Sequence, residues 1–258
     1  MFLLDKWYLD VVTSGGEVAI VYSARLRWGA VRVGYASALE DCGPGAHHES
    51  RTLRAVEAPR HNASALTWHN RILDVEGCWQ CDAPPIDRTL ASTSVGEIRW
   101  SCQMLRARAS IRIADRTYDG LGYVERLRLT IPPRKLPFDA LRWGRHLSDR
   151  CSLIWIDWRG AEHRSWVWLN GTEQPAALVT DAGVCGLVDG AELCLEEGRD
   201  VLNRHTIVSL SDLLPAVVRR ASAPLAGMRE RKRVARSSIV IGSNRVDQGW
   251  TLHELVTW

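Results

Sequence analysis

The stretch Leu121-Gly-Tyr-Val-Glu-Arg-Leu-Arg-Leu-Thr-Ile131 alternates between two kinds of side chain and decides the fold class. From Leu121 to Ile131 every second residue is apolar or aromatic, with one exception. A period of two is typical of a β-strand that buries one face. The exception is Glu125, which falls on the apolar face between Tyr123 and Leu127.

Glu125 has two interpretations. A carboxyl group on an apolar face loses its hydration and favours its protonated form unless a cation pairs with it. A protonated carboxyl near neutral pH is a candidate general acid. The alternative is a structural ion pair with an arginine across the sheet, for which Arg142 and Arg145 are available.

Further alternating stretches predict an antiparallel β protein. Residues 5–12, 17–28 and 31–39 read as three consecutive strands of a meander. Residues 97–113 predict a hairpin in which the phase of the alternation flips at Met104–Leu105, which indicates a bulge or sharp bend. Such bends curl sheets into barrels.

The remaining chain adds strands but almost no helical periodicity. Only Ser211–Arg220 could form a short helix, with Ser211 as its N-cap. Residues 64–76 predict a further strand, and residues 41–50, which contain His47 and His48, predict a loop. We therefore expect an all-β fold. The cluster Pro132, Pro133 and Pro137 is the expected boundary between two β-barrel halves, residues 1–131 and 132–258.

Composition excludes several functional classes. The 258 residues carry a formal net charge of +3, too small to indicate nucleic-acid binding by itself. The arginines on strands alternate with the aromatic residues and so point away from them, unlike a single-strand binding surface. The phosphate-binding, nucleophile-elbow and His-Glu-x-x-His motifs are absent from the sequence. We therefore expect no nucleic-acid partner.

The cysteines and the N-terminal residues predict a cytoplasmic protein with reduced thiols. Met1-Phe-Leu-Leu4 is followed at once by Asp5 and Lys6, so no signal-peptide core develops. Cys78-Trp-Gln-Cys81 has zinc-ligand spacing, but no second pair accompanies it among the 7 cysteines. We therefore predict no metal site.

Tryptophan is the unusual feature of the composition, and the strongest charge cluster is a basic run. There are 12 Trp against 5 Tyr and 2 Phe, which either fill a core or line a broad cavity, and core packing is the commoner fate. The basic run Arg229-Glu-Arg-Lys-Arg-Val-Ala-Arg236 predicts a solvated face. Its alternative interpretation is a patch for anionic head groups in a peripheral membrane contact.

Two more ionisable groups accompany Glu125 inside apolar stretches. Asp157 interrupts the apolar run 152–158, and His146 lies in Leu141-Arg-Trp-Gly-Arg-His-Leu147. Trp143 and His146 fall on opposite faces of a regular strand, so both reach one pocket only if Gly144 bends the chain. A lone histidine is more often a hydrogen-bonded structural residue than a catalyst.

The chain resembles the lipocalin-like carotenoid 1,2-hydratase (hydroxyneurosporene synthase) family. The resemblance lies in Asp5-Lys-Trp-Tyr-Leu-Asp10, Gly120-Leu-Gly-Tyr-Val-Glu125, Leu141-Arg-Trp-Gly-Arg-His146 and Leu153-Ile-Trp-Ile-Asp-Trp158, in order over most of the chain. The chain is shorter than many members, and the resemblance does not align the family's catalytic acid to one position.

The resemblance implies two lipocalin-like barrels, no organic cofactor and a large hydrophobic substrate, in some members an isoprenoid. It implies acid-initiated hydration, cyclisation or isomerisation, in which aromatic faces stabilise a carbocation. The alternative is a carrier that binds a lipid or pigment without chemistry. The expected catalytic groups are Glu125, Asp157 and His146, and the expected substrate-binding residues are Tyr123, Trp143, Arg145, Trp100 and Trp155.

Overall fold

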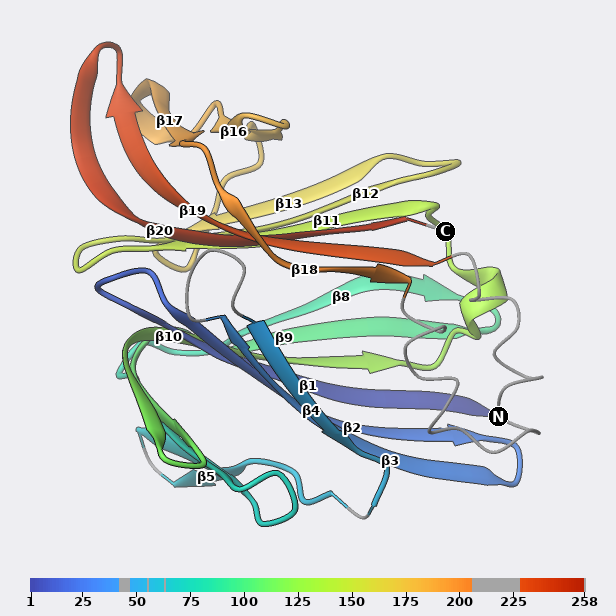
Figure 1. The fold of residues 1–258 in the computed structure, drawn as a ribbon. Helices are drawn as coiled ribbons and strands as arrows, with labels where there is room; N and C mark the ends of the chain where they lie inside the picture. The colour runs from blue at the N-terminus through green and yellow to red at the C-terminus, as the bar shows by residue number, and fades with distance from the viewer. Residues whose placement is uncertain (42–46, 55, 63, 206–227, 258) are drawn as a thin grey trace. The chain divides into compact units, whose positions relative to one another are not determined.

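The protein, described by a computed structural model over residues 1–41, 47–54, 56–62, 64–205 and 228–257, is all-β (Figure 1). Its strands form two ten-stranded antiparallel sheets. The chain divides into two compact units, Met1–Lys135 and Leu136–Trp258. The change of unit falls within the proline-rich segment 132–137. No helix in the described part of the chain has the length and hydropathy to span a membrane.

The first unit contains one sheet, in the order β4-β3-β2-β1-β10-β9-β7-β6-β5, with β8 paired to β9. Its strands are β1 (Phe2–Thr13), β2 (Val18–Trp28), β3 (Val31–Asp41), β4 (His47–Thr52), β5 (Arg60–Asn62), β6 (Ala65–Asn70), β7 (Val75–Gln80), β8 (Ile86–Thr93), β9 (Gly96–Ile113) and β10 (Arg116–Leu129). A short 3₁₀ helix, η1 (Pro133–Lys135), follows β10.

The second unit repeats this topology strand for strand. Its sheet has the order β14-β13-β12-β11-β20-β19-β17-β16-β15, with β18 paired to β19, so each strand of the first unit corresponds to the strand numbered ten higher. The strands are β11 (Ala140–Leu147), β12 (Ser152–Arg159), β13 (Arg164–Leu169), β14 (Thr172–Glu173), β15 (Leu178–Val179), β16 (Gly183–Cys185), β17 (Ala191–Leu195), β18 (Arg199–His205), β19 (Arg229–Ile241) and β20 (Asn244–Thr257), and a short 3₁₀ helix, η2 (Val188–Gly190), precedes β17.

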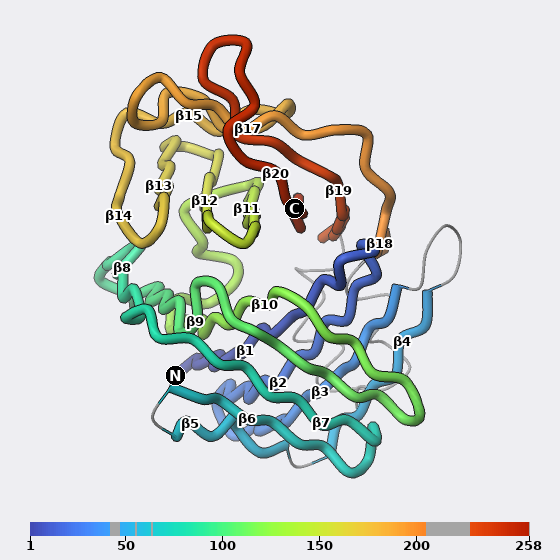
Figure 2. Tube along the Cα trace, turned by 90° about the vertical axis from the view of Figure 1, so that its left-hand side faces the viewer, coloured from blue at the N-terminus to red at the C-terminus, as the bar shows by residue number. Residues whose placement is uncertain are grey.

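The first sheet curls into a half-barrel around its own core. Figure 2 shows β6 and β7 folded back beneath β1 and β2. Trp79 on β7 donates from Nε1 to the carbonyl oxygen of Asp10 on β1 at 2.8 Å. Because β9 and β10 separate these strands in the sheet, this bond crosses the inside of the curl. The carbonyl of Glu57 closes the same curl, accepting from Ser23 on β2 and from Trp68 on β6, both at 3.0 Å.

The predicted phase flip on β9 is a bulge, but the predicted hairpin is wrong. Residues 96–113 form one continuous strand. Val124 pairs with Met104 while Gly122 pairs with Ala107, so the register shifts beside the predicted position. The bend separates the part of β9 that pairs with β8 from the part that pairs with β7. The alternation of side chains therefore predicted the position of the bulge in β9, but not which strand pairs with β9 on either side of it.

Two further local predictions are wrong, and a third falls outside the described residues. His47 and His48 begin strand β4 at the edge of the sheet, so the loop prediction for residues 41–50 is wrong there. Residues 64–76 contain β6 and the start of β7 with a turn between them, rather than one strand. The helix predicted over Ser211–Arg220 lies outside the described residues.

The second sheet presents two different buried faces along β11 and β12. One face carries Leu153, Trp155 and Val167 in an apolar core with strands β16 and β17. The opposite face carries buried Trp143, Ile156 and Trp158. Most of the described tryptophans are thus core residues: Trp68, Trp79, Trp100, Trp143, Trp155, Trp158 and Trp168 are all buried.

Candidate functional site

Three of the predicted site residues lie together in the first unit, where Tyr123 and Trp100 both contact Glu125. Glu125 sits on β10 opposite Tyr8 of β1 and Cys102 of β9. Its Oε2 accepts a hydrogen bond from Trp100 Nε1 at 2.5 Å and one from the Tyr123 hydroxyl at 2.9 Å. The period-two prediction that Tyr123 and Glu125 share a face is confirmed. Arg142 and Arg145 belong to the other sheet, so neither is a cross-strand neighbour of Glu125.

Aromatic rings surround this carboxylate. Tyr8 packs edge-on against Tyr22 with ring centroids 5.3 Å apart, and it lies 6.2 Å from the ring of Tyr123. All three tyrosines are buried. The Lys6 ammonium lies over the Tyr22 ring, 4.7 Å from its centroid. Aromatic rings therefore make up much of the face around Glu125, together with the ring hydroxyls and the Lys6 ammonium.

Cys102 and Tyr123 are held in their neutral forms beside Glu125. Burial raises the pKa of the Cys102 thiol well above its ordinary value, although a hydrogen bond with Tyr123 opposes the shift. Burial also raises the pKa of Tyr123, and the neighbouring Cys102 and Glu125 raise it further. A protonated Tyr123 keeps its hydroxyl hydrogen available for the carboxylate. Glu125 therefore faces two fixed donors, an indole N–H and a phenol O–H.

The remaining predicted residues lie in the second unit, on two faces of β11 and β12. The register of β11 runs without a shift from Ala140 to Leu147, so Gly144 does not bend the strand. Trp143 and Arg145 consequently share one face while His146 lies on the other. Gly144 instead makes room for an indole, because a Cβ there would lie 2.1 Å from Cζ2 of Trp155.

Asp157 is fully buried and bonded at both carboxylate oxygens. Oδ2 accepts from Arg159 Nε at 3.1 Å, and Oδ1 lies 2.5 Å from His163 Nε2. In the register of the sheet, Asp157 on β12 lies opposite Arg142 on β11. Arg142 and His146 are four residues apart on β11, so Asp157 lies roughly 13 Å along the strands from His146. The structure therefore does not bring Asp157 and His146 together.

His146 belongs to a separate polar cluster inside the second unit. Its Nδ1 lies 2.7 Å from the Ser237 hydroxyl, which in turn lies 2.7 Å from the Thr251 hydroxyl. Its Nε2 lies 3.3 Å from Oδ2 of Asp247. His146, Ser237 and Thr251 are fully buried. Ser237, Asp247 and Thr251 lie 91 to 105 residues after His146 in the sequence. The one feature of the sequence that could have indicated them is that they are polar residues within partly apolar strands.

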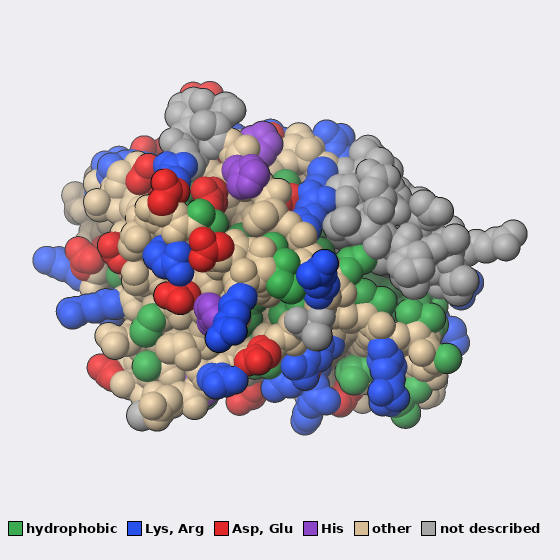
Figure 3. Space-filling model, turned by 60° about the horizontal axis from the view of Figure 1, so that its bottom comes forward, with side chains coloured by type: hydrophobic (Ala, Val, Ile, Leu, Met, Phe, Trp, Pro, Cys, Tyr) green, Lys and Arg blue, Asp and Glu red, His purple; other side chains and the backbone are tan. Residues whose placement is uncertain are grey.

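The basic run at 229–236 is a strand whose charges are largely paired. Lys232 is 1% exposed and forms ion pairs with Glu230 and Glu254. Arg231 and Arg233 both contact Asp200 on β18, at 3.0 and 3.3 Å. The run is therefore not one solvated face, and the pairing reduces the charge it could offer to a head group. On the face shown in Figure 3, basic side chains lie among acidic and apolar ones.

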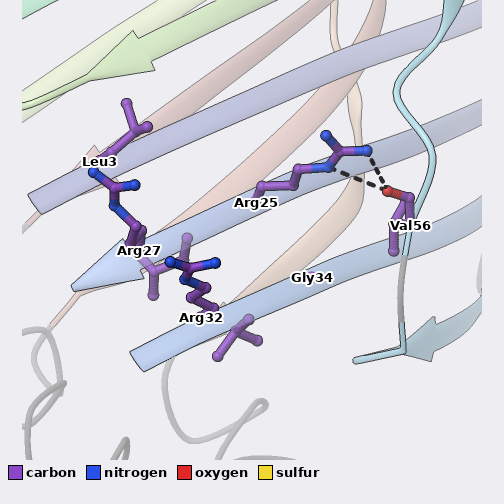
Figure 4. Close-up of a pocket in the computed structure, with 8 residues that line it drawn as sticks. Leu3, Arg25, Arg27, Arg32, Gly34 and Val56 are labelled. Carbon is purple, nitrogen blue, oxygen red and sulfur yellow. Dashed lines mark hydrogen bonds between the residues drawn. The ribbon is translucent and has the colours of Figure 1, made fainter. Parts of the chain in front are cut away.

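A hollow of about 570 Å³ opens on the first unit at the end of β1, β2 and β3 (Figure 4). Arg25 lines it and donates from Nε and Nη2 to the carbonyl of Val56, another lining residue, at 3.3 and 3.0 Å. Arg27 and Arg32 extend from neighbouring strands. The hollow is lined by Leu3, Arg25, Leu26, Arg27, Arg32, Val33, Gly34 and Val56, and so contains none of the predicted site residues.

The fold, but not the sequence, matches known proteins. No family model and no curated protein matches the sequence. Among solved structures, kievitone hydratase from Nectria haematococca superposes with a TM-score of 0.52 at 10% identity, covering 98% of this chain and 88% of that one. The chain has the same tandem-barrel fold.

Two further structures show the same likeness. A putative AttH from Nitrosomonas europaea gives a TM-score of 0.55 at 11% identity, covering 98% of this chain and 92% of that one. CghA, solved with Sch210972, gives 0.54 at 11% identity and covers 99% and 88%. The likeness therefore spans both units, and at this identity it establishes the fold alone.

Proposed function

We propose that the protein is a cofactor-independent enzyme that transforms a hydrophobic small molecule by acid-initiated hydration, cyclisation or isomerisation. The observation that carries this proposal is the carboxyl group of Glu125, held by Trp100 and Tyr123 on a face of buried aromatic rings. Glu125 is the proton donor. The substrate class follows from the apolar surroundings of the acid, and an isoprenoid or polyene with a reactive double bond suits it.

The two donors suit Glu125 to lose a proton to carbon. When the protonated carboxyl transfers its proton to an alkene carbon, a carbon–carbon π bond breaks and a carbocation forms beside a new carboxylate. The Trp100 N–H and the Tyr123 hydroxyl stabilise that carboxylate. The rings of Tyr8 and Tyr123 stabilise the cation through their faces. Water, an internal π bond or loss of another proton then completes hydration, cyclisation or isomerisation.

The comparisons support this proposal at the level of fold. Kievitone hydratase is a hydratase by name, and CghA was solved together with a small organic molecule, Sch210972. Both cover nearly the whole of this chain. A scaffold shared with such proteins is compatible with chemistry on a hydrophobic molecule, although fold alone does not determine function.

Transfer of a solvent-exchangeable proton to carbon tests the proposal. Purified protein is incubated in heavy water with an apolar extract of its host cells, and the products are analysed by mass spectrometry. We expect the wild type to form a product carrying deuterium on carbon, because Glu125 exchanges with solvent. Glu125→Gln keeps the side-chain volume and should form none.

The control is Glu97→Gln, a substitution at a partly exposed carboxylate on the neighbouring strand β9. It should behave as the wild type does. Incorporation of deuterium by Glu125→Gln at the wild-type rate would rule out Glu125 as the acid. If the wild type and Glu125→Gln both bind the same molecule and leave it chemically unchanged, the protein is a carrier.

A further inference from the structure

Three potential metal ligands converge in the second unit, on chain segments far from Glu125 in sequence. His146 lies at the end of β11, Cys151 lies in the turn that leads to β12, and Asp247 lies near the start of β20. One ligand atom from each, a ring nitrogen, a thiol sulfur and a carboxylate oxygen, lie within 4.8 Å of one another. We propose that these three side chains bind a zinc ion.

The spacing of the nitrogen and oxygen ligands matches a tetrahedral site. Zinc binds histidine nitrogen at about 2.0–2.1 Å and carboxylate oxygen at about 2.0–2.2 Å, which places two such ligands roughly 3.4 Å apart. His146 Nε2 and Asp247 Oδ2 are 3.3 Å apart. The Cys151 sulfur lies within 4.8 Å of both atoms. A zinc–sulfur bond of about 2.3 Å would place it roughly 3.6 Å from the nitrogen, so the thiol is within reach of the third ligand position.

The other ring nitrogen of His146 is already fixed by a hydrogen bond, as in established zinc sites. A ligating histidine nearly always uses its second ring nitrogen to donate to a nearby acceptor, which sets the tautomer and the orientation of the ring. Here Nδ1 is 2.7 Å from the Ser237 hydroxyl, and Thr251 extends the chain of hydrogen bonds. With Nδ1 as the donor, Nε2 presents its lone pair to Asp247 and Cys151.

Ser148 orients the other two ligands. Its hydroxyl oxygen accepts the backbone N–H of Cys151 at 2.9 Å, which shapes the turn that carries the thiol. The same side chain also hydrogen-bonds the carboxylate of Asp247. Both ligands are therefore held in place by a residue that does not contact the ion.

The ligand set and its burial favour zinc over other common ions. Imidazole, thiolate and carboxylate together suit zinc, whereas calcium and magnesium prefer oxygen alone. A thiolate and a carboxylate balance the charge of a divalent ion, and the thiol proton is released to solvent on binding. His146 and Cys151 are buried, and the Asp247 side chain is 13% exposed, which leaves a route and a fourth position for water.

The proposed ion would tie the β11–β12 turn to the start of β20 at one end of the second sheet. Without an ion, the same three groups would remain a histidine–aspartate pair with a neighbouring thiol. A metal site and a histidine–aspartate pair can be distinguished by experiment, because only the metal site requires the Cys151 thiol as a ligand. This inference does not rest on the proposed acid chemistry.

Metal content and cobalt substitution of the full-length protein test the site. The protein is purified in the presence of zinc, dialysed against a weak chelator and analysed for bound metal, and cobalt is then exchanged into the site. We expect about one ion per chain and, with cobalt, an intense tetrahedral visible spectrum with a thiolate charge-transfer band. Asp247→Asn and Cys151→Ser should each weaken binding at least about tenfold.

Two cysteine variants serve as matched controls. Cys194→Ser removes an exposed thiol of the same unit, and Cys78→Ser removes one member of the Cys78-Trp-Gln-Cys81 pair. Both should retain the ion and the spectrum. Absence of stoichiometric metal from the wild type, or loss of it in Cys78→Ser alone, would overturn the proposal. So would a cobalt spectrum lacking the thiolate band, which is independent of whether either ligand variant folds.

Discussion

His253 is a partly buried base that its surroundings keep neutral. Burial first, and then the positive charges of nearby arginines such as Arg233 and Arg142, together lower its pKa from 6.5 to about 4. In the unfolded chain this histidine takes up a proton below about pH 6.5. The folded state resists protonation until about pH 4. Between these values the unfolded state binds more protons, so stability falls as the pH falls.

We therefore expect His253→Gln to remove part of the acid sensitivity of the fold. From pH 7 to about pH 4, the wild type should lose up to about 3 kcal/mol more free energy of unfolding than the variant loses. Urea unfolding at both pH values measures this difference. His69→Gln, at a half-exposed histidine on β6, is the control and should follow the wild type. Equal losses in wild type and His253→Gln would contradict the assignment.

Gly144 is required because the backbone of β11 lies against an indole. A Cβ there would approach Trp155 to 2.1 Å and the Cβ of His253 to 2.9 Å. Gly144→Ala should therefore destabilise the protein by about 1–3 kcal/mol through overpacking. Gly15→Ala provides the control, because its added Cβ would only reach ordinary contact with Thr13 at 3.7 Å. Thermal unfolding of both variants measures the effect, and equal melting temperatures would refute it.

At the scale of the elements, the first half-barrel is closed by the bond from Trp79 on β7 to β1. Trp79 is fully buried, and its Nε1 satisfies the carbonyl of Asp10. Trp79→Phe leaves a cavity and removes the hydrogen bond to β1, which together should cost about 2–4 kcal/mol. Trp166→Phe, at a half-buried indole of the second sheet, should cost less than half as much. Denaturant unfolding compares the two, and similar costs would show that the bond does not close the curl.

Alternation along the chain predicts strands well and their ends poorly. The strands at 5–12, 17–28 and 31–39 correspond to β1, β2 and β3. Each of the three is buried on both faces over part of its length, at residues 8–12, 18–24 and 36–41, so the expectation that these strands bury one face is wrong there. The start of strand β4 escaped prediction because His47-His48-Glu49-Ser50 is polar at an edge position and has no apolar period. The phase flip revealed the bulge in β9, but periodicity carries no information on where a chain reverses.

At the scale of the whole molecule, the two units share one strand order without a visible sequence repeat. Strand order is set by partners distant in sequence, which periodicity does not report. The candidate sites show the same limit. The face of Glu125 follows from alternation on β10, whereas its contact with Trp100 depends on the register of β9 against β10. His146 meets Asp247 across 101 residues, and nothing local indicated that pairing.

The most direct test of the central claim compares the molecules that co-purify with the wild type and with Glu125→Gln from the same host. Native mass spectrometry with extraction identifies them. If Glu125 is the acid, the variant retains the substrate while the wild type carries product or nothing. Substrate and product should then differ by one water for hydration, or be isomers for cyclisation or isomerisation. The same unchanged molecule in both proteins, in equal amount, would contradict the enzyme and indicate a carrier.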